Sequence, residues 1–109
     1  MLLPVIVVYQ VEPILTPHRL SVTEAAVAIA AGNLTSEDLV RDCLARIEKR
    51  EPVVRAWAAL DSYRAIAEAR ELDRHFSRNG AVGPLHGIPV GIKDMIDTAD
   101  LPTQHNSPL

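Results

Sequence analysis

The chain has 109 residues, which is enough for one small domain or for part of a larger one. Hydrophobic residues make up 48% of the sequence and charged residues 23%, a globular composition that argues against a disordered tail. The net charge of -3 comes without a basic patch, so no nucleic-acid partner is indicated.

The chain opens with an apolar run over residues 1–9 that contains Pro4. The run is too short to cross a bilayer and has no basic residues before it, which argues against a membrane anchor or a signal peptide. We therefore expect no membrane partner. We expect residues 1–20 to form an extended arm that Pro13 and Pro17 carry to the first helix.

A capping box begins the first predicted helix. Ser21 and Glu24 are three residues apart, so the serine oxygen can accept from an early helical amide while the glutamate reaches back to the amide of the cap. This pattern predicts a helix over residues 22–31. Gly32 supplies the left-handed residue that ends it.

A second cap signal at Thr35 predicts another helix to about Arg50, which Pro52 ends. Its apolar residues recur at spacings of four on one face: Leu39, Cys43, Ile47, Val40 and Leu44. We expect the two helices to cover part of a sheet. The alternative is a hairpin that binds a partner through its apolar face.

The single cysteine, Cys43, has no partner for an internal disulfide and lies on the apolar helical face. This placement favours a small buried hydrophobe in a reducing compartment, and we expect a cytoplasmic protein. A nucleophilic thiol needs a base beside it, and none of the four histidines is near Cys43 in sequence. The histidines also have no metal-ligand spacing with Cys43, so neither a metal nor another cofactor is expected.

A strand, a long helix and a second strand are predicted next, in the order of a βαβ unit. β-Branched and aromatic residues predict the first strand over residues 53–60, with Trp57 packed in the core. Asp61 caps a helix to about Arg78, and the apolar run of residues 88–92 is typical of a buried strand. The apolar stripe of the helix is Ala65, Ala69, Leu72 and Phe76.

Lys93 follows the predicted second strand directly and is the candidate catalytic residue. Burial there disfavours the ammonium form and lowers the pKa from about 10.4, which would make the amine a base. The alternative is an ion pair with Asp94 or Asp97, and on these residues alone that structural role is favoured. A histidine side chain can also act as a general base, and His86 lies in the loop before Lys93, but a structural role is the preferred interpretation for it.

Residues 83–94 read Gly-Pro-Leu-His-Gly-Ile-Pro-Val-Gly-Ile-Lys-Asp. This block resembles the lysine block of the amidase signature family, and the resemblance extends more weakly over residues 20–109. It implies that Lys93 is the base of a Ser-cisSer-Lys triad that hydrolyses or transfers amides, and that His86 is structural. Both serines of the family lie downstream in a Gly/Ser-rich stretch, which this sequence does not reach.

The resemblance also implies an α/β fold, the family's α/β/α sandwich with a mixed sheet. Residues 21–109 would form its N-terminal part: helical hairpin, strand, long helix and strand. In the family a loop near the substrate follows the lysine block. Ser107 falls in the corresponding stretch, so the resemblance makes it a substrate-pocket neighbour, with a local turn hydroxyl as the alternative.

Three functions remain open. The first is an amidase that acts on a small-molecule amide. These 109 residues would be its N-terminal part, without the two serines, and would be inactive alone. The second is one component of an amidotransferase that acts on misacylated tRNA and that includes a partner subunit. The third is a non-catalytic module that binds a partner through its helices. The expected contacts are self-association or docking with the rest of an amidase domain.

Overall fold

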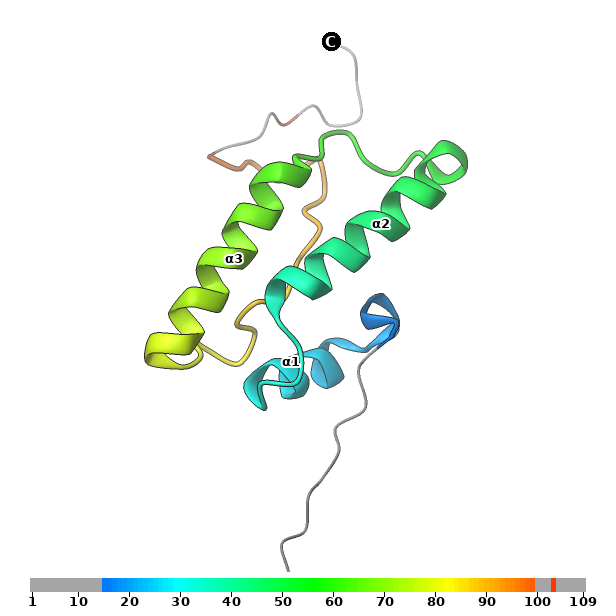
Figure 1. Cartoon of the computed structure of the whole chain (residues 1–109). Coiled ribbons are helices and arrows are strands. Elements are labelled where there is room, and N and C mark those ends of the chain that lie inside the picture. The colour runs from blue at the N-terminus through cyan, green and yellow to red at the C-terminus, as the bar shows by residue number, and fades with distance from the viewer. Residues whose placement is uncertain (1–14, 100–102, 104–109) are drawn as a thin grey trace, which may run out of the picture.

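The computed structural model describes residues 15–99 and residue 103. These residues form a short 3₁₀ helix η1 (Pro17–Arg19) and three α-helices, α1 (Val22–Ala30), α2 (Ser36–Val54) and α3 (Ser62–Asn79). Helices α2 and α3 lie side by side, and α1 lies near the N-terminal end of α2 (Figure 1). Most of the predicted arm, residues 1–20, falls outside the described residues.

The predicted caps are confirmed. The amide of Glu24 donates to Ser21 Oγ over 3.1 Å, and the amide of Ser21 donates to Glu24 Oε1 over 2.9 Å, which is the predicted capping box. Thr35 Oγ1 accepts from the amide of Asp38 over 3.1 Å, and Asp61 caps α3 in the same way. These caps satisfy amides that a helix start otherwise leaves without partners.

Helix α2 continues through Pro52 to Val54, so the prediction that Pro52 ends it is wrong. A proline at this position removes one helical hydrogen bond and its ring crowds the carbonyl of the residue four before it, but α2 continues for two residues beyond Pro52 in spite of this cost. The helix ends instead at Arg55, which has a left-handed φ of 50° and donates its amide to Glu51 O over 2.8 Å. Glu51 Oε1 then accepts from the amide of Trp57 over 3.0 Å and holds the chain that leaves the helix.

The predicted α/β fold is contradicted, because the described residues form helices and no strand. Val53 and Val54, expected to open the first strand, belong to α2, and residues 55–60 are irregular. Residues 88–92 are not assigned to a strand either. A β-branched or apolar run becomes a strand only when another strand pairs with it, and the described residues provide no such pair. The predicted βαβ unit and mixed sheet are therefore absent from this part of the chain.

The core lies where α1 meets the start of α2. Buried apolar side chains come from α1, from the turn that follows it and from the first turn of α2: Ala25, Ile29, Leu34 and Leu39. The predicted stripe of α3 is confirmed, since its residues are all partly or fully buried, with Ala69 only 2% exposed. One ion pair connects α3 to α2, between Arg70 and Glu37, and Glu37 also pairs with Arg41 of its own helix.

Helix η1 is held against α2 by one carboxylate. Asp42 Oδ2 accepts from the amide of His18 over 2.7 Å and lies 2.6 Å from His18 Nδ1. Burial pushes the pKa of Asp42 upward, but the hydrogen bonds from His18 outweigh it, so this pKa lies below its ordinary value. The ionised carboxylate therefore stabilises the contact between η1 and α2.

Candidate functional site

The loop of residues 82–87 is fixed to α3 by the ring of His86. The amide of Val82 donates to Nδ1 over 3.1 Å, and Nε2 lies 3.0 Å from the carbonyl oxygen of Leu72. The amide can only donate and the carbonyl can only accept, so the ring is neutral with its hydrogen on Nε2. His86 is 8% exposed, and both of its ring nitrogens are engaged in bonds to the backbone. This geometry supports the structural role and leaves no ring nitrogen to act as a base.

Gly87 fits directly against the start of α2. Its φ is +78°, and a Cβ added there would lie 3.0 Å from Ser36 Cβ and 3.4 Å from Ile29 Cδ1. Ser36 Oγ donates to the carbonyl oxygen of Gly87 over 2.7 Å, and Ser36 is 1% exposed. Only glycine accommodates both the left-handed backbone and this close approach.

Asp73 of α3 caps α2 from outside that helix. Its two carboxylate oxygens accept from the amides of Ser36, over 2.7 Å, and Glu37, over 3.0 Å. A negative charge at a helix N-terminus is favoured by the helix dipole as well as by the hydrogen bonds. This contact was not predicted from the sequence. The available signal was an acidic residue, Asp73, directly next to the apolar stripe residue Leu72.

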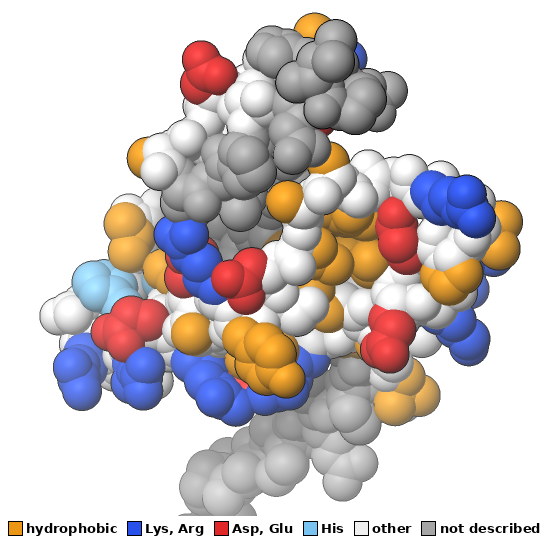
Figure 2. Space-filling model, turned by 90° about the horizontal axis from the view of Figure 1, so that it is seen from above, with side chains coloured by type: hydrophobic (Ala, Val, Ile, Leu, Met, Phe, Trp, Pro, Cys, Tyr) orange, Lys and Arg blue, Asp and Glu red, His pale blue; other side chains and the backbone are white. Residues whose placement is uncertain are grey.

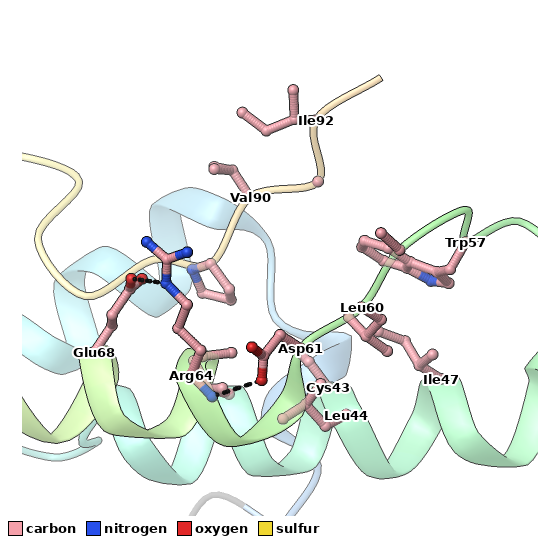
Figure 3. A pocket seen from close by; sticks show the side chains of 15 residues that line it. Cys43, Leu44, Ile47, Trp57, Leu60, Asp61, Arg64, Glu68, Val90 and Ile92 are labelled. Carbon is pink, nitrogen blue, oxygen red and sulfur yellow. Dashed lines mark hydrogen bonds and ion pairs between the residues drawn. The ribbon is translucent and has the colours of Figure 1, made fainter. Parts of the chain in front are cut away.

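The segment after this loop runs back between α2 and α3 (Figure 1). Together they enclose an apolar groove of about 400 Å³. Figure 3 shows Val90 and Ile92 on one side of the groove and Trp57 and Leu60 on the other, above Ile47 of α2. On the face shown in Figure 2, hydrophobic side chains gather near the middle, with charged side chains on either side of them.

Two groove residues were expected from the sequence to have core roles. Trp57 is 39% exposed and lines the groove, so its expected place in the core is wrong. Cys43 also lines the groove and is half-buried. Burial raises the pKa of the Cys43 thiol, and the charge of Asp42 raises it further. The thiol is therefore held in its protonated form, which agrees with a packing role and opposes a nucleophilic one.

Lys93 lies at the far end of the segment and does not line the groove. Its side chain is exposed, and its carbonyl oxygen accepts from the amide of Ile96 over 3.0 Å in a turn. Lys93 was expected to be a base because it would lie at the end of a buried strand. The part of the chain that the structure describes contains no such strand. Ser107, the predicted substrate neighbour, lies outside the described residues.

Within residues 15–99 and 103, no group of three or more histidine, cysteine, aspartate or glutamate side chains could hold a metal ion. None of the helices in that range is both long enough and apolar enough to cross a membrane. The groove and the tethered loop before Lys93 are thus the candidate site.

Comparison with known proteins shows what this part of the chain is similar to. The Amidase family model matches residues 38–109. The glutamyl-tRNA(Gln) amidotransferase of Chloroflexus aggregans has an A subunit that is 47% identical over 90 residues, which cover 83% of this chain and 18% of that protein. Its counterpart in Chloroflexus aurantiacus is 44% identical over 90 residues with the same coverage.

A Mycobacterium bovis protein that bears the name amidase AmiD is 38% identical over 85 residues, which cover 78% of this chain and 18% of that protein. The chain thus spans less than a fifth of the length of these relatives. No solved structure matches it.

Proposed function

This chain belongs to the amidase family, and from that premise we propose that it supplies the catalytic lysine, Lys93, of an enzyme that cleaves or transfers amide bonds. The observation that carries the proposal is the family match over residues 38–109, which includes the complete block of residues 83–94. The tethered loop of residues 82–87 supports it, because a general base must be positioned relative to the group whose proton it takes.

In this proposal the neutral amine of Lys93 accepts a proton from a bridging serine, which takes one from the nucleophilic serine. The nucleophilic oxygen then adds to the amide carbon, the C–N bond breaks, and the amine leaves with the proton. Water later hydrolyses the acyl-enzyme. Both serines, and the cover that would desolvate Lys93, come in this proposal from sequence that the relatives contain and these 109 residues do not.

The test is a chimera of the Chloroflexus aggregans relative in which this chain replaces the matching segment. Its activity is followed as ammonia release from primary amides. Lys93→Ala should lower turnover by about 10²–10⁴-fold, the usual contribution of a general base. Lys93→Arg should fail equally, because it keeps the positive charge but does not lose its proton.

Lys49→Ala is the matched control, since Lys49 is an exposed lysine on α2 and should be dispensable. Wild-type turnover in Lys93→Ala would refute the catalytic role and favour the non-catalytic, partner-binding module. Turnover lost in Lys93→Ala but kept in Lys93→Arg would show that only the charge matters.

A second candidate is a tRNA-dependent amidotransferase. The names of the two Chloroflexus relatives favour it, because each denotes one subunit of such an enzyme and so implies a partner. Purification of the chimera from cells that express the other Chloroflexus aggregans subunits distinguishes the two. A stoichiometric complex that transfers ammonia favours the amidotransferase, and a free enzyme that only hydrolyses amides favours the amidase.

A further inference from the structure

The ring of His86 holds the start of the segment that leads to Lys93. We propose that His86 is a positioning residue for Lys93, acting through the backbone of Gly87. This inference rests on the proposed base role of Lys93. It assigns to His86 a function in the reaction without any contact with the reacting atoms.

The hydrogen-bonding capacity of the His86 ring is fully used. One nitrogen accepts from Val82 N–H and the other donates to Leu72 O, so the ring fixes both the loop and its own tautomer. The ring also packs beside Phe76, with centroids 5.8 Å apart. Without the ring, the Leu72 carbonyl loses its donor and the Val82 amide loses its acceptor. The loop is then no longer fixed to α3.

Gly87 connects His86 to the lysine. It follows His86 directly and is seated on Ser36 by the 2.7 Å hydrogen bond and by a fit too tight for a Cβ. After Gly87 the chain passes along the groove, which Pro89, Val90, Gly91 and Ile92 line, and Lys93 follows them directly. The seat at Gly87 therefore sets where the segment enters the groove, and a shift there is passed on to Lys93.

Two measurements test the inference. In the 109-residue chain, His86→Ala should accelerate hydrogen exchange of the Val82 amide, which loses its acceptor, and of the Ile88 amide, which bonds to Leu85 O over 3.1 Å. In the chimera, His86→Ala should lower kcat by about 10²-fold with KM nearly unchanged, because a misplaced base affects the chemical step and not substrate binding.

Two further variants separate positioning from simple stability. His86→Gln keeps one acceptor and one donor and should recover part of kcat and of the exchange protection. His18→Ala is the matched control, since His18 is a histidine bonded to Asp42 on another part of the fold. It should leave kcat and the Val82 and Ile88 exchange rates unchanged.

Three results decide the matter. Faster exchange, a lower kcat and rescue by His86→Gln support the inference. Wild-type kcat in His86→Ala, while Lys93→Ala is inactive, overturns the positioning role and leaves the proposed function standing. Full activity in Lys93→Ala overturns the proposed function and, with it, the positioning role.

Discussion

Gly87→Ala tests the contact between the loop and α2 most directly. The substitution has two costs. An alanine in the left-handed region costs about 1–2 kcal/mol, and a Cβ placed 3.0 Å from Ser36 Cβ forces a displacement in a packed region. Overpacking of this kind typically costs about 1–3 kcal/mol. We expect a total destabilisation of about 2–5 kcal/mol.

Gly32→Ala is a closely matched control. Gly32 has a φ of +77°, against +78° at Gly87, but nothing lies within 4 Å of its added Cβ. Both variants therefore carry the backbone strain, and only Gly87→Ala carries the steric cost. The assay is urea unfolding of the 109-residue chain, followed by circular dichroism, with the free energy of unfolding taken from the midpoint and slope.

The expected difference between the two variants is at least about 1 kcal/mol. Ser36→Gly removes the two atoms closest to the new Cβ, Ser36 Cβ and Oγ, so in the Gly87→Ala background it should reduce this difference. Equal destabilisation by Gly87→Ala and Gly32→Ala would show that the loop is not seated on Ser36, and it would remove the link through which His86 is proposed to position Lys93.

Two further predictions concern titratable groups. The pKa of Asp42 is lowered in the folded state, so its contribution to stability is complete above the ordinary value of 3.8 and is lost as the pH falls through the folded-state value. Unfolding curves at several acidic pH values should show this loss, and Asp42→Asn should remove it. The raised pKa of Cys43 predicts slow alkylation of the folded chain at neutral pH. Iodoacetamide labelling measures the rate, and labelling as fast as that of the urea-unfolded chain would contradict the prediction.

The helix starts could be predicted because their signals are local. Ser21, Thr35 and Asp61 each bond an amide three residues ahead, so the sequence contains both partners of each contact. The end of α2 at Arg55 could not be predicted in this way. Pro52 loses a helical hydrogen bond and crowds the carbonyl four residues before it, which favours an end at that point, but α2 continues to Val54 and ends at the left-handed Arg55.

The strands failed as predictions because pairing is not local. Val53, Val54 and residues 88–92 have the composition of strands, but composition does not supply the neighbour that a strand needs. For the candidate site the sequence offered Lys93, through the family resemblance, and the catalytic role of Lys93 stays a prediction. The hydrogen bond between Ser36 and Gly87 joins residues that are 51 positions apart in the sequence. The two bonds to Asp73 span 37 and 36 positions, so no local sequence pattern predicts any of these contacts.

The caps by Asp73 also bear on the order in which the chain folds. Helices α2 and α3 are consecutive in the chain and are joined by a short connection, so they can pair as neighbours. Before the helices pair, 51 residues separate Gly87 from Ser36. Once Asp73 holds the helices together, the loop that remains to be closed runs only from α3 to Gly87 and has about 14 residues. The entropic cost of closing the loop at Gly87 then falls by about 1 kcal/mol. Loop-closure entropy therefore favours an order of folding in which the helix pair forms before the segment that carries Lys93 docks onto it.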